Sequence, residues 1–337
     1  MGSGDLGLDG EHAIAVIENG PGDIAPAVRN VRGYLDATMA KSTRDDYVRA
    51  WVHFGRWCMD RGFVALPAEV ATVVLYVGVL AGDPATPEAG ERPSTLGKRL
   101  AAIGRIHRLA GHDPPPTASE PVRMLMRGVR RRKGARPRRK APLSVAQMRS
   151  IVAALPGTVK GVRDRALLLL GFAGAFRRSE VVALDVEDVA FVPEGMRVLL
   201  RRSKTDQEGA GLVKGLPTGR RPETCAVQAV QTWIATASLS SGPLLRPVDR
   251  HGRVAGRRLS GHMVGCVVKE AVRRVGLDAS LFSGHSLRSG LATAAAAAGA
   301  AERDIMRQTG HRSERQIRAY IREGSVFVDN AVARLDL

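Results

Sequence analysis

Apolar residues recur at helical spacing along the first part of the chain. The first apolar face consists of residues three or four positions apart: Tyr47, Trp51, Phe54 and Cys58. Ser42-Thr43 precedes this face and is predicted to cap the helix that carries it. A second stretch, Ala68 to Leu80, is apolar on nearly every face and predicts a buried helix.

Two more helices are predicted before the middle of the chain. One runs from Leu96 to Ala110 after a cap at Ser94-Thr95, and the other runs from Glu120 to Val129. A run of three prolines, Pro114 to Pro116, separates them. Residues 26–130 therefore predict a small domain made only of helices.

A second domain begins with a clear helix start. Ser144 with Gln147 three residues later forms a capping box, and Arg163 to Ala175 predicts a buried helix. Arg177 follows directly after this apolar run. A buried cation without a partner is costly, so Arg177 is expected to meet Glu180 or a ligand anion, whereas Arg178 is expected to face solvent.

Three short stretches of strand character come next: Asp188–Val192, Met196–Arg202 and Gly211–Leu216. The last two are joined by a polar turn that contains Lys204, and helices are predicted at Glu223–Ala237 and Gly261–Val275. The second domain is therefore expected to be mainly helical with a small antiparallel sheet of three strands.

Charge is distributed unevenly along the chain. The whole sequence carries +18 and its first 25 residues carry −5, so the remainder carries +23. This imbalance indicates a polyanionic partner, and the alternative is a basic soluble protein without such a partner. The acidic residues 1–25 are expected to form a disordered tail that avoids DNA.

The basic residues are densest between the two domains. From Arg127 to Lys140, nine of fourteen residues are Lys or Arg, and residues 131–142 are interpreted as a basic linker that lies along a phosphate backbone. The alternative is a solvated basic run. The side chains expected to contact DNA are Lys41, Arg44, Lys98, Arg105, Arg108, Arg130, Arg131, Arg132, Lys133, Arg138, Arg139 and Arg202.

Several other classes of protein do not fit the sequence. The three cysteines have no zinc-ligand spacing, no paired carboxylates indicate a metal site, and no phosphate-binding loop of the ATPase type is present. No apolar stretch reaches the ~20 residues that span a bilayer, and no signal peptide is seen. We therefore expect no cofactor, no metal, no membrane contact and a cytoplasmic location.

The candidate chemistry lies near the C-terminus. His285 and Arg288 are three residues apart at the start of a helix, where free N–H groups also favour an anion. Thr309-Gly310-His311 follows, and Tyr320 comes nine residues after His311 on an amphipathic helix. A single tyrosine in such a helix is ordinarily a core residue. The cations around it favour a role in holding and attacking a phosphodiester.

These residues resemble the active-site series of the tyrosine recombinases, the phage-integrase superfamily. The likeness covers residues 26–337 and is nearest to the Cre type of the family. It rests on AFRRSE, the hairpin Lys204, SGHSLRSG, TGH and AYIR, together with LPAEV, GRIHRLAGHDPP and VRMLMRGVRRR.

The resemblance implies a role for each residue. Arg177 and Arg288 would hold the non-bridging oxygens of the scissile phosphate, and Lys204 would protonate the leaving 5′-oxygen. His285 would assist proton transfer, and His311 stands where the family has His or Trp as a donor to the phosphate. Tyr320 would be the nucleophile. Glu180 would support Arg177.

The resemblance also implies the assembly and the reaction. A catalytic domain at 143–325 and the all-helical domain would enclose duplex DNA, and four protomers would exchange strands through a 3′-phosphotyrosyl link and a Holliday junction. Residues 326–337 would pack on a neighbouring protomer, and the free protein would be a monomer. The alternatives are a type IB topoisomerase and a DNA-binding protein without catalytic activity.

Overall fold

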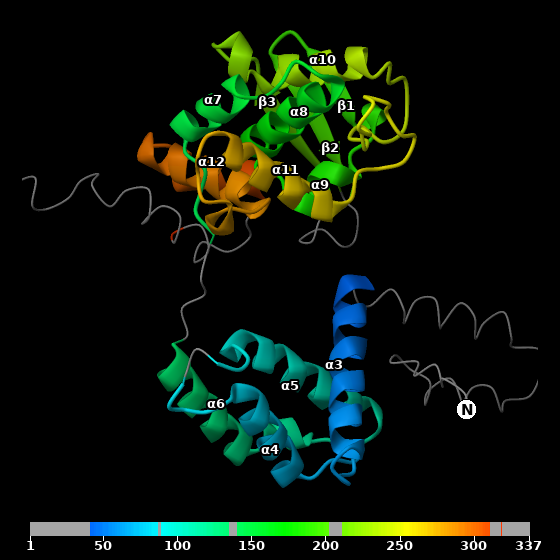
Figure 1. The fold of residues 1–337 in the computed structure, drawn as a ribbon, viewed down its shortest axis with the longest axis vertical. Helices are drawn as coiled ribbons and strands as arrows, with labels where there is room; N and C mark the ends of the chain where they lie inside the picture. Colours follow the sequence, from blue (N-terminus) through cyan, green and yellow to red (C-terminus); the bar gives the residue numbers. More distant parts are fainter. Residues whose placement is uncertain (1–40, 87–88, 135–139, 202–210, 311–317, 319–337) are drawn as a thin grey trace, which may run out of the picture. The chain divides into compact units, whose positions relative to one another are not determined.

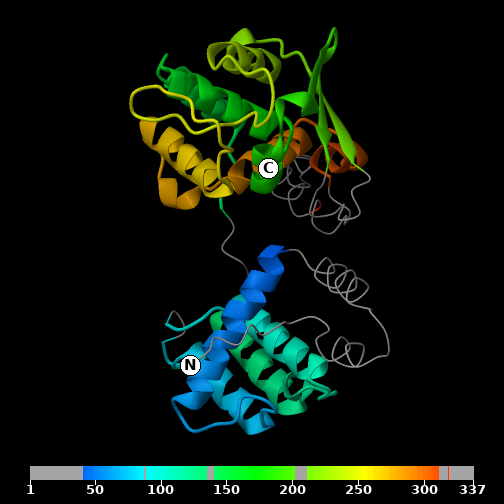
Figure 2. The same cartoon turned by 90° about the vertical axis from the view of Figure 1, so that its right-hand side faces the viewer.

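The chain forms two compact units, Met1–Pro137 and Arg138–Leu337, each with its own hydrophobic core. The structure, a computed structural model, describes residues 41–86, 89–134, 140–201, 211–310 and 318. Figures 1 and 2 show the two units from two sides. No helix in these described ranges is both long enough and apolar enough to cross a membrane.

The described part of the first unit is helical. Its helices are α3 (Lys41–Met59), α4 (Val70–Ala81), α5 (Pro93–Leu109) and α6 (Glu120–Lys133), with a short 3-10 turn at Pro116–Ala118. The predicted apolar face of α3 is confirmed, because Phe54 and Cys58 are fully buried and Trp51 is nearly so. Phe54 and Trp57 both make edge contacts with the buried ring of Tyr76 on α4.

Several predicted helix boundaries in this unit are wrong. Helix α3 already includes Lys41, so Ser42 and Thr43 lie inside it and do not cap it, and α4 begins at Val70 and not at Ala68. Helix α5 begins at Pro93, with Arg92 before it, so Ser94 and Thr95 lie inside the first turn and do not cap it. Proline is favoured in a first turn because its missing N–H has no helical partner there. Helix α6 does not end at Val129 but continues to Lys133, so part of the basic run is helical.

His107 is the buried polar residue that joins two parts of the first unit. Its Nε2 accepts the N–H of Ala68 at 2.9 Å, and its Nδ1 bonds to the carbonyl of Ile103 at 2.8 Å. The ring must therefore be neutral, with the proton on Nδ1. Burial lowers the pKa of His107, the bond to Ile103 raises it, and His112 lowers it further.

We expect the first unit to lose stability in acid because of His107. The folded pKa lies below the ordinary value of 6.5, so the unfolded chain binds more protons and the stability from this group falls as the pH drops below 6.5. Pulsed hydrogen exchange of α5 in urea at pH 7.5 and pH 5.5 would measure this loss. His107→Gln, which does not titrate, should remove most of the pH dependence, whereas His112→Gln should weaken it less, because His112 only adds to the lowering of the His107 pKa that burial causes.

The second unit contains seven described helices and one described sheet. The helices are α7 (Val145–Ala153), α8 (Val159–Ala173), α9 (Arg178–Ala183), α10 (Ala226–Thr236), α11 (Gly261–Arg274), α12 (His285–Ala297) and α13 (Glu302–Thr309). Short 3-10 turns lie at Val186–Asp188, Pro222–Thr224 and Ala279–Leu281. The antiparallel sheet has the order β1 (Val189–Val192), β2 (Gly195–Leu200) and β3 (Leu212–Pro217). This confirms the predicted fold class.

Two helices of this unit differ from prediction at their starts. Helix α8 begins at Val159 and not at Arg163, because the Thr158 hydroxyl accepts the N–H of Gly161 at 3.2 Å. Helix α10 begins at Ala226, because Pro222–Thr224 forms a 3-10 turn before it. The predicted capping box of Ser144 and Gln147 is confirmed by its two reciprocal bonds of 2.9 and 3.1 Å.

Helix α8 is the centre of the core, with α10 and α12 packed against it (Figure 1). Two glycines allow α12 to lie close to α8 and to the segment at Leu143. A Cβ on Gly171 would lie 2.8 Å from Leu287, and a Cβ on Gly290 would lie 2.3 Å from the carbonyl oxygen of Leu143. The start of α12 is thereby fixed against the end of α8.

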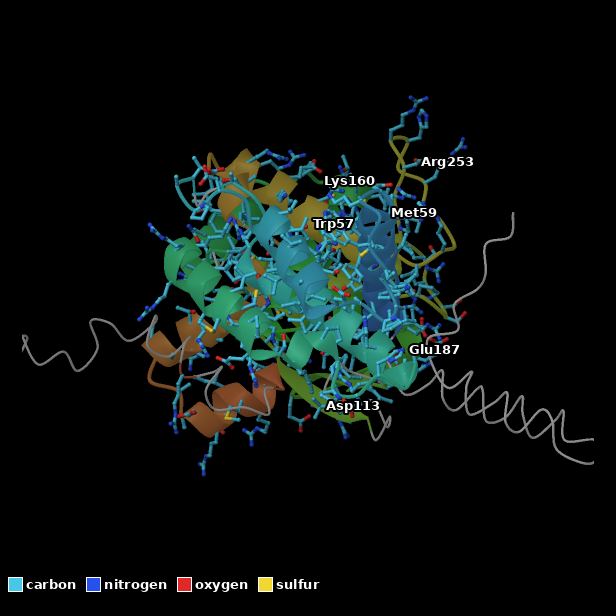
Figure 3. All side chains as sticks on the ribbon, turned by 90° about the horizontal axis from the view of Figure 1, so that it is seen from below. Trp57, Met59, Asp113, Lys160, Glu187 and Arg253 are labelled. Carbon is cyan, nitrogen blue, oxygen red and sulfur yellow. The ribbon has the colours of Figure 1, made fainter. Side chains whose placement is uncertain are left out.

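A small loop between α10 and α11 extends from this unit. Val248 and Val254 form an isolated bridge, and the N–H of Asp249 donates to the carbonyl of Arg253 at 3.0 Å. Figure 3 shows that Arg253 lies in the part of this loop that projects from the surface. The sequence analysis did not predict it.

Candidate functional site

Arg177 and Glu180 form a pair at the start of α9. One Glu180 oxygen accepts the guanidinium Nη1 of Arg177, and the other accepts its backbone N–H at 2.8 Å. Glu180 is almost fully buried, whereas Arg177 is partly exposed. The predicted pairing is confirmed. Glu180 holds the Arg177 side chain, which stays partly accessible to solvent. Arg178 is exposed, as predicted.

The turn that presents Arg177 is held by Arg288. Ala175 lies in the left-handed region, with φ of 47°, which is strained for a residue with a Cβ. Arg288, buried on α12, donates its Nη1 to the Ala175 carbonyl at 2.8 Å. The structure therefore brings the two predicted phosphate-binding arginines to the same turn.

His285 is exposed at the start of α12, while Arg288 is buried one turn later. Two backbone amides that the sequence left available for an anion are bonded inside the turn. The N–H of His285 donates to the Ser283 hydroxyl at 3.2 Å, and the N–H of Ser286 donates to the Ser283 carbonyl at 2.9 Å. An anion at this end would therefore depend on side chains more than on these amides.

Arg177 and His285 line one open cavity of about 940 Å³. Most of its other polar lining is also basic, and it comes from Arg178, Ser179, Arg258 and His262. Arg258 is fixed there, because it donates to the carbonyls of Val182 and Leu184 and pairs with Asp185 at 2.5 Å. A cavity lined by arginines and histidines is suited to an extended anion.

Lys214 is a buried cation that the sequence analysis missed. It is 3% exposed on β3, and its Nζ donates to the carbonyls of Gly174 at 2.7 Å and Gln308 at 2.6 Å. Burial lowers the pKa of Lys214 to about 8; Glu180 raises this pKa, and Arg288 and Arg177 lower it. The signal was in the sequence, since Lys214 shares the inward face of a strand with Leu212 and Leu216.

Helix α13 ends at Thr309, two residues before His311. Gly310 takes the left-handed conformation, with φ of 67°, and its N–H donates to the Met306 carbonyl at 2.7 Å. Thr309 is buried and its hydroxyl donates to the Ile305 carbonyl at 2.7 Å. A glycine in the left-handed conformation is a common way for a helix to end.

Several predicted residues lie outside the described part of the structure. Among the predicted catalytic residues these are Lys204, His311 and Tyr320, and among the predicted DNA contacts they are Arg138, Arg139 and Arg202, together with the side chain of Lys41. The tail at 326–337 and the acidic segment 1–25 also lie outside it. Their roles stay predictions.

The other predicted DNA contacts in the first unit are at least partly accessible. Lys98 and Arg108 are exposed on α5, and Arg130, Arg131 and Arg132 are exposed on α6. Arg44, Arg105 and Lys133 are half-buried, and Lys133 bonds to the carbonyl of Ala89. Within the described ranges, no group of three or more His, Cys, Asp or Glu side chains is arranged to hold a metal ion.

Sequence comparison finds relatives over most of the chain. The Phage integrase family matches residues 142–325. An integrase/recombinase XerD homologue of Selenomonas ruminantium is 39% identical over 307 residues, which cover 89% of this chain and 87% of the relative. Recombinase Cre of Escherichia phage P1 is 25% identical and covers 81% of each chain. Of these two, the XerD homologue is the more similar, so the Cre type is a narrower assignment than these matches support.

Structure comparison finds the same fold at low identity. The XerH site-specific recombinase bound to its palindromic difH substrate is matched with a TM-score of 0.58 at 14% identity, over 80% of this chain and 73% of XerH. A lambda integrase dimer bound to a core site is matched with a TM-score of 0.55 at 14% identity, over 84% of this chain and 89% of the integrase.

Proposed function

Since the chain belongs to the phage integrase family of tyrosine recombinases, we propose that it recombines duplex DNA at specific sites by covalent catalysis, without metal or ATP. Tyr320 would attack the scissile phosphorus, forming a 3′-phosphotyrosyl bond and releasing a 5′-oxygen that Lys204 protonates. The reverse attack by a 5′-hydroxyl of another strand would release the tyrosine. The link conserves the energy of the bond, so rejoining would need no ATP.

One observation carries this proposal: Arg288 and Glu180 both hold the turn that presents Arg177, beside a cavity that His285 also lines. As a phosphodiester is attacked, negative charge grows on its equatorial oxygens, and fixed donors stabilise that charge. Arg177 and Arg288 would bind those oxygens, and guanidinium groups suit them because each can donate two bonds at once. His285 and His311 would add further donors.

The partners would be duplex DNA and three more copies of the chain. The exposed cations of α5 and α6 would neutralise phosphates, which positions the protein without identifying bases. We propose that the free protein is a monomer and that a tetramer with a Holliday junction forms on two DNA sites. The segment 326–337 would pack on a neighbouring copy.

A nicked suicide substrate tests the covalent step. Cleavage near a nick releases a short oligonucleotide, so the adduct cannot be reversed and can be counted in a denaturing gel. Sequencing the trapped DNA would identify the target site. If substrates that carry this site form no adduct, the proposal is wrong. If supercoiled plasmid is relaxed without sequence preference, the topoisomerase alternative gains support.

We expect Lys204→Ala to lower the cleavage rate on this substrate by roughly 10²–10³-fold, because the leaving oxygen would lose its proton donor. A substrate with a 5′-phosphorothiolate bond has a leaving sulfur that needs no protonation. It should restore the rate of the variant. Undiminished cleavage of the ordinary substrate by Lys204→Ala would exclude this lysine as the general acid.

A further inference from the structure

Lys214 occupies a position that the strand pattern reserves for a core residue. On β3 the exposed positions Val213 and Gly215 alternate with the inward positions, and Lys214 pairs with the buried Val198 of β2. Its ammonium also lies 4.7 Å from the centre of the Phe176 ring. Burying an ammonium is costly, and an apolar side chain would suit this core better for stability alone.

The bonds of Lys214 converge on the end of α8. Three consecutive carbonyls there, at residues 173, 174 and 175, each accept a side chain from a different element. Gln308 of α13 donates to Ala173 at 2.7 Å, Lys214 to Gly174 at 2.7 Å and Arg288 of α12 to Ala175 at 2.8 Å. The last carbonyls of a helix have no partner inside it, and their partial negative charge favours cations.

Lys214 also binds the end of α13. Its Nζ donates to the carbonyl of Gln308 at 2.6 Å, three residues before His311, while Gly174 lies three residues before Arg177. Figure 2 shows α13, in red-orange, beside the green strands of the sheet. One ammonium thus joins the two chain segments that lead into Arg177 and into His311.

We propose that Lys214 is a positioning residue for DNA cleavage: it fixes the turn before Arg177 against the end of α13 and so holds Arg177 in place for the scissile phosphate. The inference rests on the proposed function and adds a residue to it. Lys214 itself does not touch the phosphate, since its amine is buried and bonded to two carbonyls. Nor does it replace Lys204, which is predicted to donate a proton from the β2–β3 turn.

The test measures single-turnover cleavage of the nicked substrate at saturating protein, alongside DNA affinity and thermal unfolding. We expect Lys214→Met to cleave about a hundredfold more slowly, as displaced catalytic groups do, with DNA affinity changed less than about threefold. Lys214→Arg, which restores the charge and donors, should recover most of the rate. The matched control is Arg197→Met, which removes an exposed cation from β2 and should cleave normally.

A second variant keeps the test valid if Lys214→Met does not fold. Gln308→Ala removes only the neighbouring bond to Ala173 and should lower the cleavage rate about tenfold without loss of DNA affinity. In an Arg177→Lys background, Lys214→Met and Gln308→Ala should lower the cleavage rate much less than they do in the wild type, because they act through Arg177. If Lys214→Met acted only by destabilising the fold, its loss of cleavage rate would instead multiply in full with the loss caused by Arg177→Lys.

Two results would overturn the inference. Folded Lys214→Met with cleavage within about threefold of wild type would show that the lysine does not position the site, as would losses that multiply fully with Arg177→Lys. Failure of the proposed function is distinct from both, since it would appear as absence of an adduct with the wild-type protein.

Discussion

Tyr320→Phe is expected to abolish the covalent DNA adduct while leaving DNA binding unchanged. The substitution removes one oxygen atom, and that atom is the predicted nucleophile. In enzymes that form a covalent intermediate, removal of the side-chain nucleophile lowers the rate by more than about 10⁴-fold. Denaturing gels of the nicked substrate measure the adduct, and a mobility-shift assay in the same buffer measures the binding.

A control for Tyr320→Phe is available in the first unit. Tyr76 is fully buried, its hydroxyl bonds to His53 at 2.9 Å, and burial raises the pKa of Tyr76 to about 12. Tyr76→Phe therefore also removes a phenol oxygen, but from a group that is neither accessible nor ionised, and adduct formation should persist. If Tyr320→Phe protein is still trapped on DNA, the assignment of the nucleophile is wrong.

The elements with strong local signals were predictable from sequence. The capping box of Ser144 and the apolar face of α3 depend on residues three or four positions apart, and the three strands depend on alternation, so short windows contain the information. The turn at Arg177 was predictable for a physical reason as well. An arginine at the end of a buried helix needs a carboxylate, and Glu180 is three residues away.

What the sequence did not reveal depends on contacts between distant segments. Lys214 bonds to carbonyls 40 and 94 residues away, and His107 accepts an amide 39 residues away. The partners in all these bonds are backbone groups, so no side-chain type in the sequence indicates them. Arg288 was identified by its spacing from His285, but its bond to Ala175 spans 113 residues and appears only in the fold.

The errors at helix starts have a related cause. The prediction places the start of α8 at Arg163, whereas the helix begins at Val159, after a cap by the Thr158 hydroxyl. The first turn does contain two apolar residues three positions apart, Val159 and Val162, which the prediction missed. Pro93 likewise begins α5 before the serine and threonine that resemble a cap. Capping depends on backbone geometry that several nearby residues can satisfy, so boundaries are less predictable than faces.

Arg288→Ala is expected to have the second-largest effect, because this arginine has two tasks. It is a predicted ligand of the scissile phosphate, and it holds the strained Ala175 turn that presents Arg177. Loss of one preorganised donor costs about 10²–10³ in rate. The loss of cleavage rate in Arg288→Ala should exceed that range, because Arg177 would be displaced as well.

Arg288→Lys distinguishes charge from geometry at this position. An ammonium keeps the positive charge but lacks the planar fork that can bond a carbonyl and a phosphate together, so cleavage should stay at least about a hundredfold below wild type. Arg303, whose side chain is 88% exposed on α13, provides the control, and Arg303→Ala should cleave within about threefold of wild type.

The measurement again separates chemistry from binding and folding. DNA affinity of both Arg288 variants should fall less than tenfold, because many other cations share the phosphate contacts. Thermal unfolding would identify a variant that has lost its core. A folded Arg288→Lys protein that cleaves at the wild-type rate would show that one charge is enough at this phosphate. It would also show that the bond to Ala175 does not set the position of Arg177.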